Sequence, residues 1–336
     1  MSTKKPSDEP RFLTDVPAEP PSEEPLDRVP LAGPPCPLFG VAVSDKDRFI
    51  AVAQDDGLVA LWQPVLAEHF GTSAPFLVGL GHTRSARSIA FEPACAREYA
   101  CVVSGSVDCT IRTWHVGDET KNSVLRHHES SVMCLAFDAA ATRLVSGSED
   151  KTIAIASWPD GRLERSFVAH ERSVLAVAIS PDGTQIASGG ADERAYLWSI
   201  DGTKVARLDD DAGHGYVWGL QFLDDERIVF TKGPRLFEWN TSSGSRVLHT
   251  LQDTRRHIHG LAVRSDRAEI AFASNDVVVT MDRDGGRVRR RTGHAGAVNG
   301  IAYLGDGRIA STGDDGALLV WGDGEEPVLR LRAGSA

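Results

Sequence analysis

The sequence contains no apolar run long enough to span a bilayer, and no apolar stretch follows the lysines near its start. Aromatic residues make up only 7% of the 336 residues, and the repeated part of the chain lacks an amphipathic helix of convincing length. We therefore expect neither a membrane span nor a secretion signal, and predict a cytoplasmic protein built from strands.

Cysteine is scarce, and its spacing is irregular. The chain has neither a C-x-x-C pair nor a His at zinc-ligand spacing, and an odd number of thiols without a signal peptide indicates a reducing compartment. The cysteines are Cys36, Cys95, Cys101, Cys109 and Cys134. Residues 282–285 begin like a calcium loop, but the third oxygen ligand and the distal Glu are missing, which favours a plain turn. We expect no metal and no cofactor.

Positively charged residues are also outnumbered: the chain has 36 Lys and Arg residues and 47 Asp and Glu residues, which give a net charge of −11. This balance argues against general nucleic-acid binding, which depends on neutralising phosphates. One local exception is the cluster Arg287, Arg289, Arg290 and Arg291. We interpret it as charge guarding an exposed edge strand; a phosphate or RNA patch is the alternative.

What the chain does contain is a repeat with a spacing near 42 residues. The recurring position is Trp in five of seven copies: Trp62, Trp114, Ala156, Trp198, Trp239, Met281 and Trp321. A fixed period in this range is typical of repeat architectures, in which most residues hold copies of one unit together. Function is then expected on the exposed faces.

Each repeat has an internal pattern of polar residues. Asp lies six residues before the recurring position, Ser lies four residues before the Asp, and His lies seventeen to twenty-two residues before the Ser. Three copies carry all four residue types: His82, Ser104, Asp108 and Trp114; His170, Ser188, Asp192 and Trp198; His294, Ser311, Asp315 and Trp321.

Each copy also predicts four short strands. In the fourth copy, the apolar runs 174–179, 185–189, 194–199 and 204–208 are separated by turns rich in Gly, Asp and Pro. Runs of five or six residues cut in this way indicate strands rather than helices.

This pattern resembles the WD-repeat family. The residues that carry the resemblance are Gly81-His82, Ser104-Gly105-Ser106, Asp108 and residues 110–114, with their counterparts in the fourth and seventh copies. The resemblance covers residues 28 to 332. It implies an all-β fold, a seven-bladed β-propeller of four-stranded antiparallel blades.

The copies are unequal, and some should lack the full polar network. The third has Ala156 in place of Trp, with Trp158 two residues later, and the first has Pro34 where His would be. The fifth has Gly233 in place of Asp, and its His214 is one residue out of register. The sixth has Thr254, Asn275 and Met281 at the three marked positions.

Recurring Ser, His and Asp could be taken for a hydrolase triad, but a nucleophile is needed once, beside an oxyanion hole. Repetition at matched places favours a structural role, in which Asp binds His, His binds Ser, and Ser accepts the Trp indole N–H. We expect these groups to hold the strands of one blade together.

Residues 1–27 differ in composition, since they alternate Pro with Asp and Glu, and we expect a disordered tail before a propeller at 28–336. Residues 11–13 are its one apolar spot. Two segments compete to complete the last blade, residues 28–32 and residues 328–332. The pattern does not choose between them.

Membership of the family implies that one residue per blade lines the mouth of the channel. By register these are Phe39, Arg87, Met133, Leu175, Trp218, His259 and Asn299. The residue before each turn Asp adds Asp55, Glu149 and Asp314. A mouth rich in aromatic and apolar residues has the composition of a binding hot spot. The alternative is that some of these side chains pack inward and fill the channel.

We therefore expect a non-catalytic scaffold that assembles a larger protein complex, binding proteins or peptides through an apolar anchor flanked by basic residues. A propeller-based enzyme and a nucleic-acid-binding module are the alternatives from other classes. Arg strongly outnumbers Lys, which is typical of a GC-rich genome, so a bacterial signalling or defence-system subunit is a further alternative.

Overall fold

The computed structural model describes residues 36–64, 75, 77–79, 81–93, 100–208, 214–252, 257–266 and 268–332. The tail at 1–27, the candidate closing strand at 28–32, and Pro34, Cys95 and Thr254 lie outside these ranges. Within them, no helix has both the length and the hydrophobicity needed to cross a membrane.

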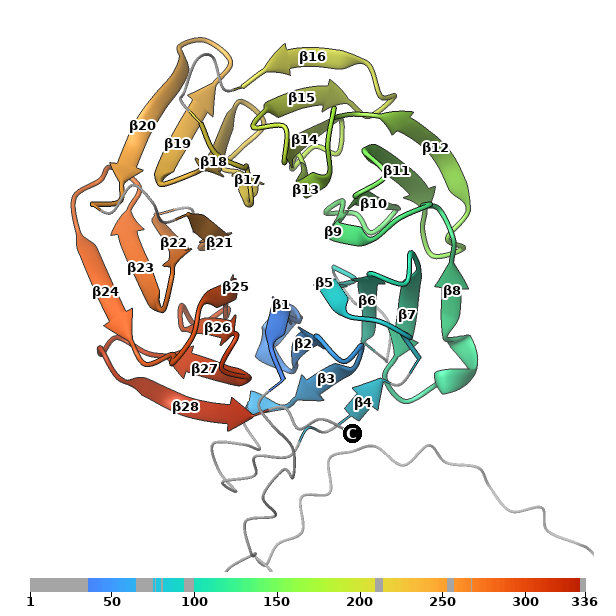
Figure 1. Cartoon of the computed structure of the whole chain (residues 1–336), viewed down its shortest axis with the longest axis horizontal. Coiled ribbons are helices and arrows are strands. Elements are labelled where there is room, and N and C mark those ends of the chain that lie inside the picture. Colours follow the sequence, from blue (N-terminus) through green and yellow to red (C-terminus); the bar gives the residue numbers. More distant parts are fainter. Residues whose placement is uncertain are drawn as a thin grey trace, which may run out of the picture.

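The described residues form seven antiparallel sheets, and every sheet consists of four strands consecutive in the chain. Figure 1 shows the sheets arranged radially around a common centre, with the first strand of each sheet innermost and the fourth on the circumference. The predicted all-β, seven-bladed propeller is therefore confirmed. The four strands predicted in the fourth copy are found, three of them with one end moved by a single residue.

The strand bounds follow the repeat. Blade one comprises β1 (Leu38–Val43), β2 (Ile50–Gln54), β3 (Val59–Trp62) and β4 (Leu77–Gly79). Blade two comprises β5 (Ala86–Phe91), β6 (Cys101–Ser106), β7 (Ile111–His115) and β8 (Ser123–Leu125). Blade three comprises β9 (Val132–Phe137), β10 (Arg143–Ser148), β11 (Thr152–Ser157) and β12 (Leu163–Val168). Blade four comprises β13 (Val174–Ile179), β14 (Gln185–Gly190), β15 (Ala195–Ser199) and β16 (Lys204–Arg207).

The remaining blades have the same form. Blade five comprises β17 (Leu220–Phe222), β18 (Arg227–Lys232), β19 (Arg235–Asn240) and β20 (Gly244–Thr250). Blade six comprises β21 (Ile258–Val263), β22 (Glu269–Ser274), β23 (Val277–Asp282) and β24 (Val288–Thr292). Blade seven comprises β25 (Val298–Tyr303), β26 (Ile309–Gly313), β27 (Ala317–Trp321) and β28 (Pro327–Arg332). Short 3-10 turns occupy Asp45–Asp47 and Glu119–Lys121.

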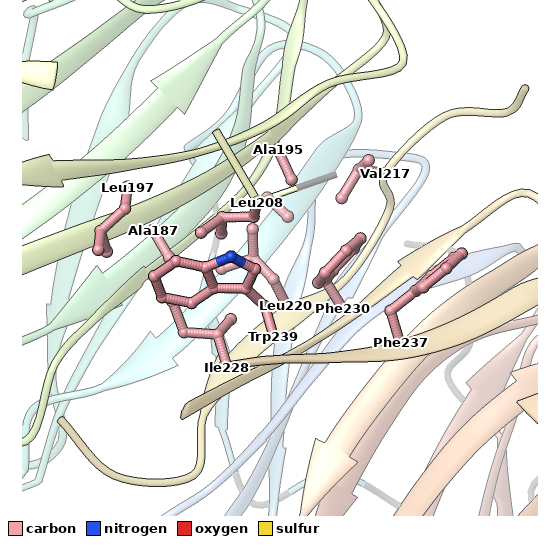
Figure 2. Close-up of a cluster of buried hydrophobic side chains, with 11 residues drawn as sticks. Ala187, Ala195, Leu197, Leu208, Val217, Leu220, Ile228, Phe230, Phe237 and Trp239 are labelled. Carbon is pink, nitrogen blue, oxygen red and sulfur yellow. The ribbon is translucent and has the colours of Figure 1, made fainter. Parts of the chain in front are cut away.

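The recurring large side chain fills the interface with the preceding blade. Trp198 packs against Val145 and Ile153 of blade three, and Trp239 packs in one cluster with Ala187 and Leu197 of blade four. Figure 2 shows this second cluster, in which the Trp239 indole lies among aliphatic side chains. Because a buried aromatic removes a large apolar area from water, the repeat places its strongest hydrophobic contact between blades.

Blade three shows how an exception is accommodated. Ala156 occupies the recurring position, but Trp158 packs against Cys101, Val103 and Ile111 of blade two, so a large side chain still fills this interface. The Trp158 indole nitrogen is buried without a hydrogen-bond partner. The interface therefore keeps its apolar volume and loses the indole hydrogen bond.

Among the described strands, the ring closes between blades one and seven without a strand that both blades share. Strand β28 pairs with β27 and completes blade seven, so the segment 328–332 takes the outer position that the sequence left open. Trp62 of blade one packs in one cluster with Leu318 and Leu331 of blade seven. The Asn299 side chain also donates to the Leu38 carbonyl across this junction at 3.0 Å.

The polar residues of the repeat form a continuous hydrogen-bond chain in blades two, four and seven. In each, the Trp indole N–H reaches the Ser hydroxyl, the hydroxyl reaches His Nε2, and His Nδ1 reaches Asp, all over 2.7–2.9 Å. Indole only donates and carboxylate only accepts, so the direction of the chain and the Nδ1–H tautomer are fixed. We call this arrangement the tetrad.

Burial shapes the protonation of the tetrads. Burial lowers the pKa of His82, although the neighbouring Asp108 acts in the opposite sense. Burial by itself would raise the pKa of Asp108, but hydrogen bonds from Thr110, His82 and the Thr83 N–H hold it at about 2. Asp315 behaves in the same way through His294 and the Ala295 N–H, with a pKa of about 2.

Blades three, five and six depart from the tetrad as the sequence predicted. Blade three keeps His128, Ser146 and Asp150 in hydrogen-bond contact but has no indole at position 156. In blade five the backbones of Gly215 and Gly233 approach so closely that a Cβ on Gly215 would lie 2.4 Å from the Gly233 Cα. His214 is 98% exposed and contacts Glu193 instead. Blade five is therefore held by packing around Trp239.

We expect Leu331→Ala to lower the free energy of unfolding by about 2–5 kcal/mol, because Leu331 is 1% exposed within the cluster that closes the ring. Urea unfolding measures this. The matched control is Val328→Ala on the same strand, which is 57% exposed and should change stability by less than about 0.5 kcal/mol. Equal small losses in both variants would contradict closure through β28.

We expect His170→Ala to lower the free energy of unfolding by about 1–3 kcal/mol, because it leaves Ser188 and Asp192 without their buried partner. His214→Ala is the control, since this His lies outside any tetrad and should cost less than about 0.5 kcal/mol. Unchanged stability in the His170 variant would show that the tetrads do not stabilise the blades.

We expect stability to decline in acid. The folded pKa of Asp108 and of Asp315, about 2, lies below the ordinary 3.8, so each contributes stability above about pH 4 that is lost as the pH falls toward 2. Each should account for a loss of about 1 kcal/mol between about pH 5 and pH 3. The lowered pKa of His82 adds a loss that begins below its ordinary 6.5. Urea unfolding at several pH values tests this, and Asp315→Asn should show a shallower decline than the wild type.

Candidate partner-binding site at the centre of the ring

One side chain from each blade converges on the centre of the ring. The seven are Phe39, Arg87, Met133, Leu175, Trp218, His259 and Asn299, and all of them line one cavity of about 520 Å³. Each lies on the innermost strand of its blade or within two residues of it. Leu175 is buried and the other six are partly exposed, so the cavity wall is mixed, with both packed and accessible side chains.

Where blades one and two form the cavity wall, an aromatic ring lies against a cation. The Arg87 guanidinium carbon lies 3.8 Å from the centre of the Phe39 ring, within the range of a cation–π contact. The Arg87 Nε atom is buried and has no hydrogen-bond partner. Positive charge therefore covers one face of the Phe39 ring.

The opposite sector is a set of stacked rings. Trp218 and His259 stack with centres 5.1 Å apart and planes 24° apart, and Tyr216 stacks on His257 at 6.5 Å. Burial lowers the pKa of His259, which favours the neutral imidazole in this stack, although Asp314 acts in the opposite sense. Val217 is fully buried, so Trp218 faces the cavity in the register that the sequence predicted.

Carboxylates lie where blades seven and one meet. Asp314 lines the cavity and accepts a hydrogen bond from Asn299 at 2.8 Å, and both Asp314 and Asp55 are exposed. The backbone N–H of Asp55 donates to the Pro37 carbonyl at 2.9 Å, which places Asp55 next to the start of blade one. The mouth is therefore negative on this side and positive beside Phe39.

Glu149, the third carboxylate predicted for this face, lies apart from the other two. It lines a separate cavity of about 400 Å³ with Arg84, Arg87 and Met133. Glu149 thus sits between blades two and three, beside positive charge.

Sequence reasoning missed several residues that shape the mouth. Tyr216 and His257 extend the ring stack, and the Arg172 guanidinium carbon lies 5.7 Å from the centre of the Tyr216 ring. All three precede the first strand of their blade by one to four residues. The spacing from that strand was the available signal, because loops at the same offset reach the same face in every blade.

The tetrads do not have the chemistry of a nucleophile site. Ser104, Ser188 and Ser311 are fully buried, and each hydroxyl already binds both an indole and an imidazole. A reacting hydroxyl must be reachable by substrate and lie near oxyanion donors. Across the described ranges, no group of three or more His, Cys, Asp or Glu residues is placed to hold a metal ion.

Comparison with known proteins identifies the repeat. Four segments match the family model described as WD domain, G-beta repeat: residues 75–115, 119–156, 161–199 and 285–322. These segments include the Ser and Asp residues of the four blades in which His, Ser and Asp are hydrogen-bonded to one another.

Several curated proteins are similar over part of the chain. Pre-mRNA-processing factor 19 of Bos taurus is 38% identical over 71 residues, which are 21% of this chain and 13% of that protein. Transducin beta-like protein 3 of Mus musculus is 29% identical over 119 residues, 34% of this chain and 13% of that protein. WD repeat-containing protein 75 of Xenopus laevis is 34% identical over 97 residues, 27% of this chain and 11% of that protein.

The matched part is thus a small fraction of each relative, and the similarity is that of the repeat unit. The chain thus forms a β-propeller of seven four-stranded blades, and four of its segments match the WD-repeat family model.

Proposed function

We propose that this propeller is a non-catalytic scaffold that assembles a protein complex by binding an apolar anchor of a partner at the mouth of its central cavity. The observation that carries the proposal is the convergence of seven side chains, one from each blade, on a single cavity of about 520 Å³. Aromatic, Met and Arg side chains such as Phe39, Trp218 and Met133 are enriched where interfaces concentrate their binding energy.

The charges around the mouth favour a particular partner. Asp55 and Asp314 are exposed beside the junction of blades seven and one, so a partner with Lys or Arg next to its apolar anchor would be complementary there. Arg87 already occupies one face of Phe39, which leaves the Trp218 and His259 stack as the larger aromatic surface for the anchor.

We expect Phe39→Ala/Trp218→Ala to weaken partner binding at least about tenfold, because truncating a central aromatic typically costs about 2 kcal/mol or more. Partners are first identified by affinity capture from the native source and mass spectrometry, and each is then purified so that its Kd can be measured by calorimetry. Val168→Ala/Val205→Ala is the matched control, since both residues are highly exposed on outer strands, 71% and 54%, away from the mouth.

Both double variants must first show wild-type thermal stability. Asp55→Asn/Asp314→Asn should lower the association rate and reduce its dependence on salt, because exposed charges act mainly through steering. Capture of the same proteins with unchanged Kd by Phe39→Ala/Trp218→Ala would overturn the assignment of the mouth. Loss of binding in the outer-strand control would do the same.

A further inference from the structure

Positive charge is concentrated on the outer strands of an otherwise acidic protein. The outer strands of blades six and seven, β24 and β28, contain five arginines and no carboxylate. They follow one another along the circumference (Figure 1). Four of these arginines have side chains that are not fully buried, and we call them the basic arc: Arg289, Arg290, Arg330 and Arg332.

The basic arc makes no ion pair within the described residues. Arg330 donates to the Gly293 carbonyl at 3.0 Å, and no ion pair joins Arg289, Arg290 or Arg332 to any carboxylate of the described ranges. Cations on neighbouring outer strands are engaged, since Lys204 lies 3.9 Å from the centre of the Tyr196 ring and Arg246 binds Glu238 at 3.0 Å. The basic arc therefore differs from these two strands.

Protection of an edge strand explains only part of this charge. Charged side chains on an edge strand discourage pairing with another chain. Adjacent like charges without ion-pair partners repel each other, more weakly as salt is added, and an anionic group bound at the arc would relieve that repulsion. Two exposed valines, Val288 and Val328, lie on the same two strands, so the surface offers apolar contact as well as charge.

The same chain contains a segment whose negative charge is complementary to the basic arc. Residues 8–27 contain seven carboxylates and a single cation, Arg11. The carboxylates are Asp8, Glu9, Asp15, Glu19, Glu23, Glu24 and Asp27. We propose that this acidic segment docks on the basic arc of its own propeller and covers it.

The covalent connection allows this contact. The described chain starts at Cys36, immediately before β1, and β1 borders blade seven at the closing junction. Eight residues lie between Asp27 and Cys36, and the nine steps from one Cα to the next span at most about 30 Å. The outer strand of a blade lies three strand spacings from the inner strand, about 14 Å. Attachment at this distance also gives the segment a high effective concentration at β28 and β24.

The segment is unsuited to extend the sheet as a regular strand, because six prolines interrupt residues 6–25 and proline cannot donate to a ladder. The contact is therefore electrostatic and sensitive to salt. Its consequence is that anionic partners reach the basic arc only when the acidic segment is displaced. This docking is independent of partner binding at the mouth.

Modification of arginine by phenylglyoxal, followed residue by residue with mass spectrometry on the full-length chain, tests the proposal. The variant replaces all seven carboxylates of the acidic segment by their amides, which leaves the propeller sequence intact. We expect Arg289, Arg290 and Arg332 to react at least about threefold more slowly in the wild type than in the variant at low salt, with the difference lost at high salt. Arg165 on β12 is the internal control, because it is exposed on an outer strand across the ring and should react equally in both proteins.

Equal rates for Arg289, Arg290 and Arg332 in the two proteins at low salt would overturn the proposal. Protection of the same arginines in the wild type only after addition of single-stranded oligouridine, or only after addition of phosphatidylserine vesicles, would also overturn it and assign the arc to nucleic acid or to an anionic membrane. A rate change that includes Arg165 would indicate a general charge effect and count equally against docking.

Discussion

The packing between the first and last blades is the contact on which the whole ring depends. Every other neighbouring pair of blades is joined by the chain itself, whereas the described residues join blades one and seven by side-chain packing and a few hydrogen bonds. At this junction the ring is held by the packing of Trp62 against Leu331 and by the hydrogen bond from Asn299 to the Leu38 carbonyl. These contacts take the place of the covalent connection found between the other blades. Because apolar burial is non-directional, the shape of the two blades must be right before this contact can form.

The tetrads and the interface aromatics divide the task of building each blade. The aromatic residue fills the space toward the preceding blade, and the buried polar chain beneath it fixes the turn of its own blade. Trp239 shows that the aromatic suffices without the polar chain, and Trp158 shows that its position can move by two residues. This separation explains why the repeat tolerates such unequal copies: a blade loses rigidity without its tetrad but keeps its interface.

Much of the fold could be predicted because the period, the turn residues and the tetrads all point to one arrangement. The ring of mouth residues was also predictable, since one register places an equivalent side chain at the centre of every blade. Other features depend on distances between segments far apart in sequence. One such feature is the position of β28 as the outer strand of blade seven. Two others are the contact of Arg87 with Phe39 and the separation of Glu149 from the carboxylates Asp55 and Asp314. No local pattern encodes them, because each depends on which segments meet in the finished ring.

Because every blade is contiguous in the chain, the central surface is a property of the finished ring alone. Asn299 and Leu38, 261 residues apart, become neighbours only when the last blade meets the first. A chain emerging from the ribosome can complete its early blades one after another, yet it presents no central mouth until its final strand has been made. A partner that recognised the mouth, as we propose, would thus distinguish completed molecules from truncated or unfinished ones, and its binding would report on the integrity of the chain.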